Sequence, residues 1–137
     1  MHLNSWPEAE VAGLSSILKR LYALCPTPDT QTHLLHLASY GEILPHVDNV
    51  SASGSWIMGV SLGGERMLRM EGPNGDNDMF EVLLPSGSVY LQRDSMRFQY
   101  KHSILKGQLA DGSDARAAQR LSIMIRDLPR SSSNGDT

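Results

Sequence analysis

The segment EILPHVDNV (42–50) places His46 and Asp48 two residues apart in a stretch with the character of a short strand. Successive side chains of a strand point to opposite sides, so these two would share one side. Imidazole and carboxylate groups are both ligands of divalent transition metals. A His-x-Asp pair also arises by chance in a chain with five histidines, so it predicts a metal site only if other residues complete it.

A third candidate ligand, His102, occurs in the segment YKHS (100–103). In a jelly roll that turned His46, Asp48 and His102 inward, the three side chains would lie on one side of a metal ion. Two histidines and one carboxylate leave three adjacent positions open, which is typical of non-haem Fe(II) oxygenases. A structural zinc site more often uses cysteines, and Cys25 is the only cysteine of the chain.

The strand-like segment RLSIMIR (120–126) carries two arginines on one face. The ordinary interpretation is the solvent-facing side of a sheet. If that face were buried, the two guanidinium groups would be costly without anions. A dicarboxylate ligand would remove this cost, because a guanidinium group binds a carboxylate through two hydrogen bonds. Alternation places Arg120, Ser122, Met124 and Arg126 on this face, and Leu121, Ile123 and Ile125 on the other.

Ahead of these segments, an amphipathic helix is predicted from about residue 6 to residue 24. Ser5 and Glu8 have the spacing of a capping box, with Pro7 in the first turn. The segment CPTPDT (25–30) would end the helix. The apolar residues that recur at helical spacing are Val11, Leu14, Leu18, Leu21 and Tyr22.

Short strands separated by turns follow the helix. This pattern is typical of a mainly β fold, a double-stranded β-helix (jelly roll) with one N-terminal amphipathic helix. We expect residues 65–71 to form a hairpin with residues 55–62, and Pro85-Ser86-Gly87 to form a tight turn. The predicted strands are 32–38, 44–48, 55–62, 65–71, 79–84, 88–92, 96–105 and 120–128, and residues 107–118 are predicted to form a loop.

The chain has 137 residues, of which 40% are hydrophobic, enough for one domain with a modest core. We assign residues 1–129 to this domain and expect the polar tail 130–137 to be disordered. The net charge of −3 disfavours a general nucleic-acid-binding surface, above all for double-stranded DNA. A single cysteine excludes an intrachain disulfide and favours a reducing compartment. No apolar run is long enough to span a membrane, and the first ten residues lack the pattern of a signal or transit peptide.

The ordered motifs HVD (46–48), YKH (100–102) and RLSIMIR (120–126) resemble the AlkB-like Fe(II)- and 2-oxoglutarate-dependent dioxygenases. Two arginines six residues apart are a hallmark of that family. Within it, the chain is most similar to the mitochondrial branch of the seventh mammalian AlkB homologue. The resemblance runs from about residue 6 to residue 129, and includes the stretches ILPHVD, LPSGSVYLQRDSMRFQYKHSIL and RxSxxIRxLP.

The resemblance implies that three side chains bind Fe(II) and four contact the cosubstrate 2-oxoglutarate. Arg120 would bind the distal carboxylate of 2-oxoglutarate, and Tyr90 would add a hydroxyl contact. Considered alone, Tyr90 is also explained as a core tyrosine, and Ser122 as a small filler. The implied iron ligands are His46, Asp48 and His102, and the implied cosubstrate residues are Tyr90, Arg120, Ser122 and Arg126.

Three other residues fall outside the ligand pattern. We interpret His33 and His36 as structural or surface residues. Arg97 is either an ordinary surface charge or a residue that steadies the cleft.

The chain also departs from the members that repair nucleic acids. Those members carry a nucleotide-recognition lid ahead of the barrel, and an asparagine and a tyrosine before the His-x-Asp motif. Here the segment LLHLAS (34–39) replaces the asparagine and tyrosine, and only a helix and a linker precede the sheet. The resemblance therefore favours a protein or RNA substrate over DNA. The chain is short for the family, and loss of N-terminal strands or of a targeting peptide is one interpretation.

The predicted function is that of a dioxygenase that hydroxylates or demethylates a protein or RNA substrate. The resemblance implies a mitochondrial location, with cytoplasm or nucleus as alternatives, and a link to fatty-acid metabolism and regulated necrosis after alkylation damage. We expect a monomer. Two rival interpretations are a non-catalytic jelly-roll module that binds metal or a partner, and a metal-dependent hydrolase that does not use 2-oxoglutarate.

Overall fold

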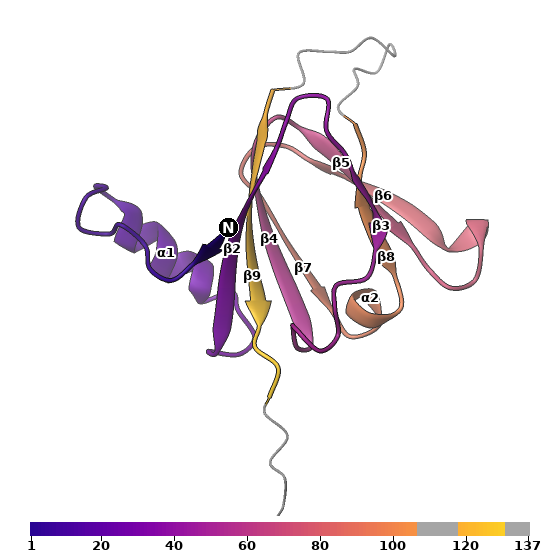
Figure 1. The fold of residues 1–137 in the computed structure, drawn as a ribbon, viewed down its shortest axis with the longest axis horizontal. Coiled ribbons are helices and arrows are strands. Elements are labelled where there is room, and N and C mark those ends of the chain that lie inside the picture. Colours follow the sequence, from indigo (N-terminus) through magenta and orange to yellow (C-terminus); the bar gives the residue numbers. More distant parts are fainter. Residues whose placement is uncertain (107–117, 131–137) are drawn as a thin grey trace, which may run out of the picture.

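The computed structural model describes residues 1–106 and 118–130, which form two antiparallel sheets that face each other (Figure 1). The larger sheet has the strand order β1-β2-β9-β4-β7, and the smaller sheet has the order β3-β8-β5-β6. This arrangement agrees with the predicted mainly β fold. The larger sheet consists of β1 (His2–Leu3), β2 (Thr30–Leu37), β9 (Arg120–Asp127), β4 (Trp56–Gly63) and β7 (Ser88–Arg93), and the smaller of β3 (Ile43–His46), β8 (Lys101–Ile104), β5 (Arg66–Glu71) and β6 (Met79–Leu84).

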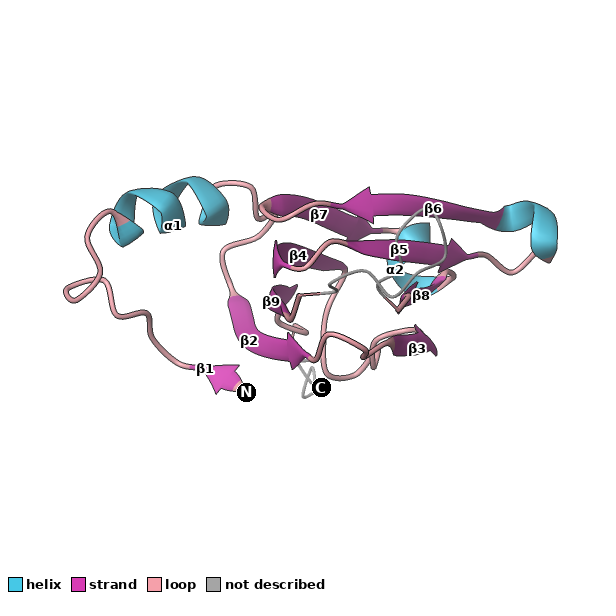
Figure 2. Ribbon diagram, turned by 90° about the horizontal axis from the view of Figure 1, so that it is seen from above, coloured by secondary structure: helices cyan, strands magenta, loops and turns pink. Residues whose placement is uncertain are grey.

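The chain passes from one sheet to the other at most of its connections, as Figure 2 shows from above, although β1 pairs with β2 and β5 pairs with β6. β4 pairs with β7 and β9, whereas β5 pairs with β6 and β8. The predicted hairpin between residues 55–62 and 65–71 is therefore wrong. Gly63 has a φ of 81°, a left-handed conformation that suits glycine, and it starts the passage from one sheet to the other. Alternation along a strand does not show which sheet the next strand joins.

The tight turn predicted at Pro85-Ser86-Gly87 is present, since Ser88 N–H donates to the Pro85 carbonyl at 3.0 Å. It joins β6 to β7 and so connects the two sheets. Gly87 has a φ of 91°, and its N–H donates to the Ser61 carbonyl at 2.7 Å. The turn therefore also fixes the start of β7 beside the end of β4.

The first α-helix, α1 (Leu14–Tyr22), has nine residues, so the predicted helix from residue 6 to residue 24 is wrong in its first half. Gly13, directly before it, has a φ of 80°, which interrupts a right-handed helix. The preceding residues form separate turns, such as the hydrogen bond from Val11 N–H to the Pro7 carbonyl. Ser5 and Glu8 lie well before the start of α1, so the predicted capping box does not cap this helix, and its N-cap residue Gly13 has no side-chain cap either.

The segment predicted as one strand from 96 to 105 is divided. A short helix, α2 (Ser95–Phe98), precedes β8, which covers only Lys101–Ile104. The short helix turns Arg97 inward, where it is buried. The brief 3-10 helix η1 (Asp76–Asp78) and the strand β1 were not predicted. Most of the loop 107–118 and of the tail 130–137 lies outside the described residues.

Two groups of buried side chains stabilise the sandwich. The first lies between α1 and the larger sheet, where Leu21 packs with Trp56 and Met58. The second joins the two sheets and includes Leu68 of β5, with Tyr90 of β7 packed against it. Among the described residues, no helix has both the length and the apolar character needed to cross a membrane.

Candidate metal and cosubstrate site

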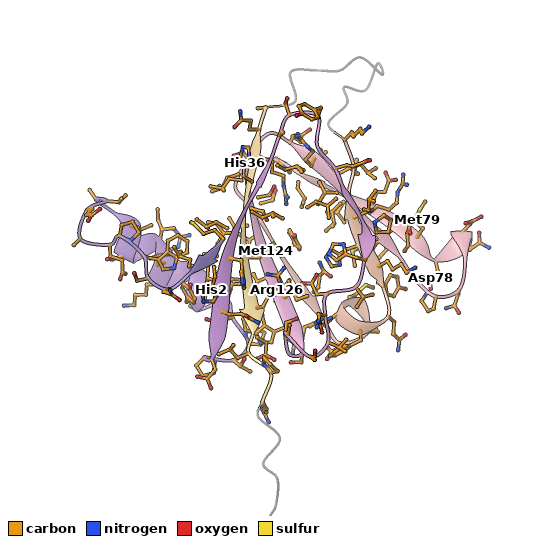
Figure 3. All side chains as sticks on the ribbon, viewed as in Figure 1. His2, His36, Asp78, Met79, Met124 and Arg126 are labelled. Carbon is orange, nitrogen blue, oxygen red and sulfur yellow. The ribbon has the colours of Figure 1, made fainter. Side chains whose placement is uncertain are left out.

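The arginine-bearing face of β9 is turned into the sandwich. Arg120 and Ser122 are each 1% exposed and Met124 is also buried, whereas Leu121 on the opposite face is 37% exposed. Figure 3 labels Met124 and Arg126 along this strand. The alternative of a solvent-facing pair of arginines is therefore wrong for Arg120, and Arg126 is half-buried. β9 lies between β2 and β4 in the larger sheet, so both of its edges are hydrogen-bonded to neighbouring strands.

The three predicted metal ligands come together on one side of the interior. β3 pairs with β8 so that His46 lies directly opposite His102, and Asp48 follows two residues after His46. Asp48 Oδ1 lies 3.1 Å from His46 Nε2 and 3.4 Å from His102 Nε2. One ligand atom from each residue lies within 4.8 Å of the others. Neighbouring ligands of an octahedral ion, each about 2.1 Å from the metal, are about 3 Å apart, so the group has the size of a metal site.

The protein orients the His46 ring for such a role. His46 Nδ1 lies 2.8 Å from the Leu44 carbonyl. A carbonyl only accepts hydrogen bonds, so Nδ1 is the donor, and in the neutral ring the lone pair then lies on Nε2. Hydrogen bonding of the second ring nitrogen is the usual device that holds a metal-binding histidine in place. Nε2 is the atom that faces Asp48.

Asp48 is held as a carboxylate. Burial opposes its ionisation, but the hydrogen bond from His102 and the charge and hydrogen bond of Arg126 outweigh burial, so the pKa of Asp48 lies well below its usual range. Arg126 Nε donates to Asp48 Oδ2 at 2.7 Å, while Oδ1 faces the two histidines. The carboxylate therefore has one oxygen paired with arginine and one oxygen available to a metal.

Arg97 fixes the loop that carries Asp48. Its guanidinium, 1% exposed, donates from Nε to the Gly54 carbonyl at 3.0 Å and from Nη1 to the Asp48 carbonyl at 3.0 Å. Nη2 donates to the Ser53 carbonyl at 3.2 Å and to Ser53 Oγ at 2.9 Å. Of the two roles left open for Arg97, the structure supports the one that steadies the cleft. The sequence carried no signal for these partners, which lie more than forty residues away.

The other end of the inner face of β9 carries Arg120. Its Nε donates to Ser61 Oγ at 2.8 Å, and its Nη2 is buried without a hydrogen-bond partner. A buried N–H without a partner is costly, so this group is suited to an anionic ligand. Ser61, which is fully buried on β4, was not identified from the sequence.

Tyr90 reaches the same interior from β7. It lies directly opposite Gly59 of β4, where a Cβ would come 2.3 Å from Cζ of the tyrosine ring, so only glycine leaves room for it. Its hydroxyl lies 3.8 Å from Met124 Sδ, and Ser122 Oγ lies 3.1 Å from the same sulfur. Burial raises the pKa of Tyr90, while the charge of Arg120 acts in the opposite direction. The Tyr90 side chain therefore carries a neutral hydroxyl group near Arg120.

A cavity of about 340 Å³ lies at the metal-ligand group and is lined by His33, His46, Asp48 and Arg126 among others. The side chain of His46 is 41% exposed, so the group is reached from solvent. His33 thus lines the site cavity, and its Nε2 lies 3.2 Å from His2 Nδ1. His36 is a surface residue as predicted, bonded to Gln119 at 2.8 Å.

Comparison with known proteins assigns the chain to a family. Residues 11–126 match the model of the 2OG-Fe(II) oxygenase superfamily. The chain is 31% identical over 135 residues to the mitochondrial alpha-ketoglutarate-dependent dioxygenase alkB homolog 7 of Bos taurus, and 34% identical over 119 residues to that of Mus musculus. These alignments cover 97% and 82% of this chain, but 61% and 54% of the relatives. The chain therefore belongs to the 2OG-Fe(II) oxygenase superfamily, and it spans little more than half the length of these relatives.

Solved structures support the fold. An oxalate oxidase in complex with the substrate analogue glycolate superposes with a TM-score of 0.51 at 11% identity, covering 72% of this chain and 42% of that chain. At this identity the likeness concerns the sandwich alone. Members of the superfamily use Fe(II) and 2-oxoglutarate, and the His46, Asp48 and His102 group has the donor chemistry of such an iron site.

Proposed function

We propose that this protein is an Fe(II)- and 2-oxoglutarate-dependent dioxygenase of the AlkB-like type. The observation that carries the proposal is the group of His46, Asp48 and His102, whose ligand atoms lie within 4.8 Å of one another. The group faces the sandwich interior, into which β9 also turns Arg120. A structural metal site would be closed by further protein ligands, whereas among the described residues this group offers two histidines and one carboxylate, which would leave positions free for a cosubstrate and O₂.

In the proposed site, His46, His102 and Asp48 would hold Fe(II), and Asp48 Oδ1 is the oxygen that faces both histidines. Arg126 holds the second oxygen of Asp48, so that only Oδ1 is presented to the ion. Bound iron and 2-oxoglutarate supply the chemistry that the side chains lack: one atom of O₂ converts 2-oxoglutarate to succinate and CO₂, and the other is inserted into a C–H bond of the substrate.

The other side chains position the cosubstrate. Arg120 binds its distal carboxylate through the buried Nη2, while Ser61 holds the guanidinium from the side. The Tyr90 hydroxyl is a second donor beside Arg120, and Ser122 and Arg126 lie along the path toward the iron on the same face of β9. A neutral tyrosine suits this role, because it donates to a carboxylate without adding negative charge.

The substrate class that we propose is a protein or RNA group that is hydroxylated or demethylated. The exposed edge of His46 and the open cavity beside it support access for a large partner. The names of both relatives support a mitochondrial location. The link to fatty-acid metabolism and regulated necrosis is proposed from the family resemblance alone. The net charge of −3 supports a substrate other than bulk double-stranded DNA, and we propose a monomer.

The test uses purified protein with Fe(II), ascorbate and 2-oxoglutarate. We expect an iron–oxoglutarate charge-transfer band without oxygen, and succinate formation once air is admitted. His46→Ala removes a ligand and should abolish both signals, because the three ligands act as a unit. His36→Ala, a surface histidine outside the metal group, is the matched control and should behave as wild type.

Two outcomes would refute the proposal. If metal binds but wild type gives neither a charge-transfer band nor more succinate than His46→Ala, the result would favour the non-catalytic jelly-roll module. Metal-dependent turnover of an ester or amide that does not change when 2-oxoglutarate is added would favour the hydrolase.

A further inference from the structure

A further arginine, Arg66, lies in the interior and has no role in the site described above. Along β5 the side chains alternate between buried and half-buried, and Arg66 shares the buried face with Leu68 and Met70. Leu68 belongs to the apolar group that joins the two sheets, so this face points toward the larger sheet. Arg66 itself is 1% exposed.

Among the residues that the structure describes, the contacts of Arg66 provide no counter-ion for its charge. Nη1 donates to the carbonyl of the preceding residue, Glu65, at 3.1 Å. Nη2 donates to the carbonyls of Ala38, Ser39 and Ala118 at 3.1–3.3 Å. All four acceptors are neutral. Nε is buried without a partner. In the part of the chain that the structure describes, neither Arg66 nor Arg120 forms an ion pair with a carboxylate.

Arg66 reaches the start of β9, since its Nη2 donates to the Ala118 carbonyl at 3.3 Å, two residues before Arg120. Gly63, three residues before Arg66, is the register partner of Arg120 in the larger sheet. Burial, and then the positive charge of Arg120, lower the pKa of Arg66. Each guanidinium is 1% exposed, and each has one buried N–H group without a partner, Nε in Arg66 and Nη2 in Arg120. Two neighbouring buried cations without an anion are strongly unfavourable, and a bound anion would relieve both.

The pair also lies at the end of the interior away from the metal ligands. Met70, four residues along β5, is the register partner of His102, so Arg66 is about 13 Å farther along the strand at about 3.3 Å per residue. On the opposite sheet, Arg120 lies six residues before Arg126, the partner of Asp48. An extended diacid bound to the metal at one end would therefore direct its other end toward this pair.

We propose that Arg66 and Arg120 together form the anion site for the distal carboxylate of 2-oxoglutarate, one guanidinium from each sheet. The inference rests on the proposed function and adds a specificity-determining residue to it. Arg120 contributes Nη2 and Arg66 contributes Nε, so the two N–H groups without partners meet the two carboxylate oxygens. The doubled positive charge makes the site selective for a dicarboxylate over a monocarboxylic 2-oxo acid.

The rival explanation is that Arg66 only clamps the carbonyls of Ala38, Ser39 and Ala118. A pair of ligands separates the two roles. 2-Oxopentanoate has the five-carbon chain of 2-oxoglutarate with a methyl group in place of the distal carboxylate. We would titrate Mn(II)-loaded protein with both ligands by calorimetry and compare the ratio of their dissociation constants, which needs no turnover.

Arg66→Gln removes the charge and should weaken 2-oxoglutarate binding roughly 10- to 100-fold, with little change for 2-oxopentanoate. Arg66→Lys keeps the charge and should restore part of the selectivity. Arg69→Gln is the matched control, since Arg69 lies on the same strand but on its outer face, paired with Glu81 at 2.8 Å. Equal weakening of both ligands, or no weakening, in Arg66→Gln would overturn the proposal in favour of a structural clamp.

A second measurement does not depend on the folding of a variant. In a crystal structure of the wild-type protein with Mn(II) and 2-oxoglutarate, we expect Arg66 Nε within hydrogen-bonding distance of the distal carboxylate. Contacts of that carboxylate with Arg120 alone would refute the role of Arg66 and leave the proposed function standing. If the wild-type protein bound no 2-oxoglutarate in either experiment, the proposed function itself would fail.

Discussion

Replacement of Arg97 tests whether the loop that carries Asp48 depends on one buried guanidinium. Arg97→Leu keeps much of the side-chain volume but removes every donor to the carbonyls of Asp48, Ser53 and Gly54. A buried polar group left without its partner costs about 1–3 kcal/mol. Three carbonyls lose their donor, and partial access of water to the loop reduces their combined cost. We therefore expect a loss of about 3–5 kcal/mol in the free energy of unfolding. For a chain of this size, this corresponds to a fall in Tm of about 10 °C or more.

The same change should weaken the metal site. Asp48 would keep its hydrogen bond to Arg126, but its backbone would no longer be anchored. Loss of a group that orients a metal ligand commonly costs about 10- to 100-fold in metal affinity, and we expect a loss in that range. Urea denaturation measures the stability, and titration with Mn(II) at a temperature where the variant is fully folded measures the affinity.

Arg93→Leu is the matched control. Arg93 lies four residues earlier and pairs at 3.4 Å with Asp94, and both side chains are largely exposed, so its loss should change stability by less than about 0.5 kcal/mol. Wild-type metal affinity in a folded but destabilised Arg97→Leu protein would show that Arg97 stabilises the fold without positioning Asp48. Unchanged stability would contradict the hydrogen bonding described for the loop.

The remaining predictions concern the cosubstrate end of the site. Gly59→Ala would place a methyl group against the Tyr90 ring, so we expect a loss of about 1–3 kcal/mol in urea denaturation, together with weaker 2-oxoglutarate binding. Ser61→Ala leaves Arg120 Nε without its acceptor and should weaken 2-oxoglutarate roughly 10-fold by calorimetry, whereas an unchanged affinity would show that Ser61 does not hold the guanidinium. The pKa of Tyr90 is raised by burial, so its contribution to stability is fully present below its ordinary pKa of 10.0 and is lost as the pH rises through the higher folded value. Denaturation between pH 9 and pH 11 should therefore show a shallower decline in Tyr90→Phe than in wild type, and parallel declines would argue against a buried tyrosine.

Local sequence patterns were sufficient for the inner face of β9. The period of two in a strand places Arg120, Ser122, Met124 and Arg126 on one side, whichever way the strand turns. The same rule places His46 and Asp48 on one side, and the proposed ligand group is found together in the structure. The turn at Pro85-Ser86-Gly87 was also predictable, because proline and glycine restrict the backbone locally.

The errors arose where a long-range contact or a single glycine outweighs local preference. Gly13 prevents α1 from extending toward the N-terminus, although Val11 continues the helical spacing of the apolar residues. The segment from Met96 to Leu105 alternates like a strand, but Arg97 gains its hydrogen-bond partners only in a short helix. Strand pairing across Gly63 could not be inferred, because a hairpin and a passage between sheets have similar turn residues.

Strand alternation in the amino-acid sequence shows which side chains share a strand face, and so which of them could act together. The packing of distant strands, in contrast, turns the arginine face of β9 inward, sets His46 opposite His102, and brings Arg66 to the start of β9. The physical reason is that alternation is a property of a few consecutive peptide units. Burial and ion pairing depend instead on which distant strands pack together.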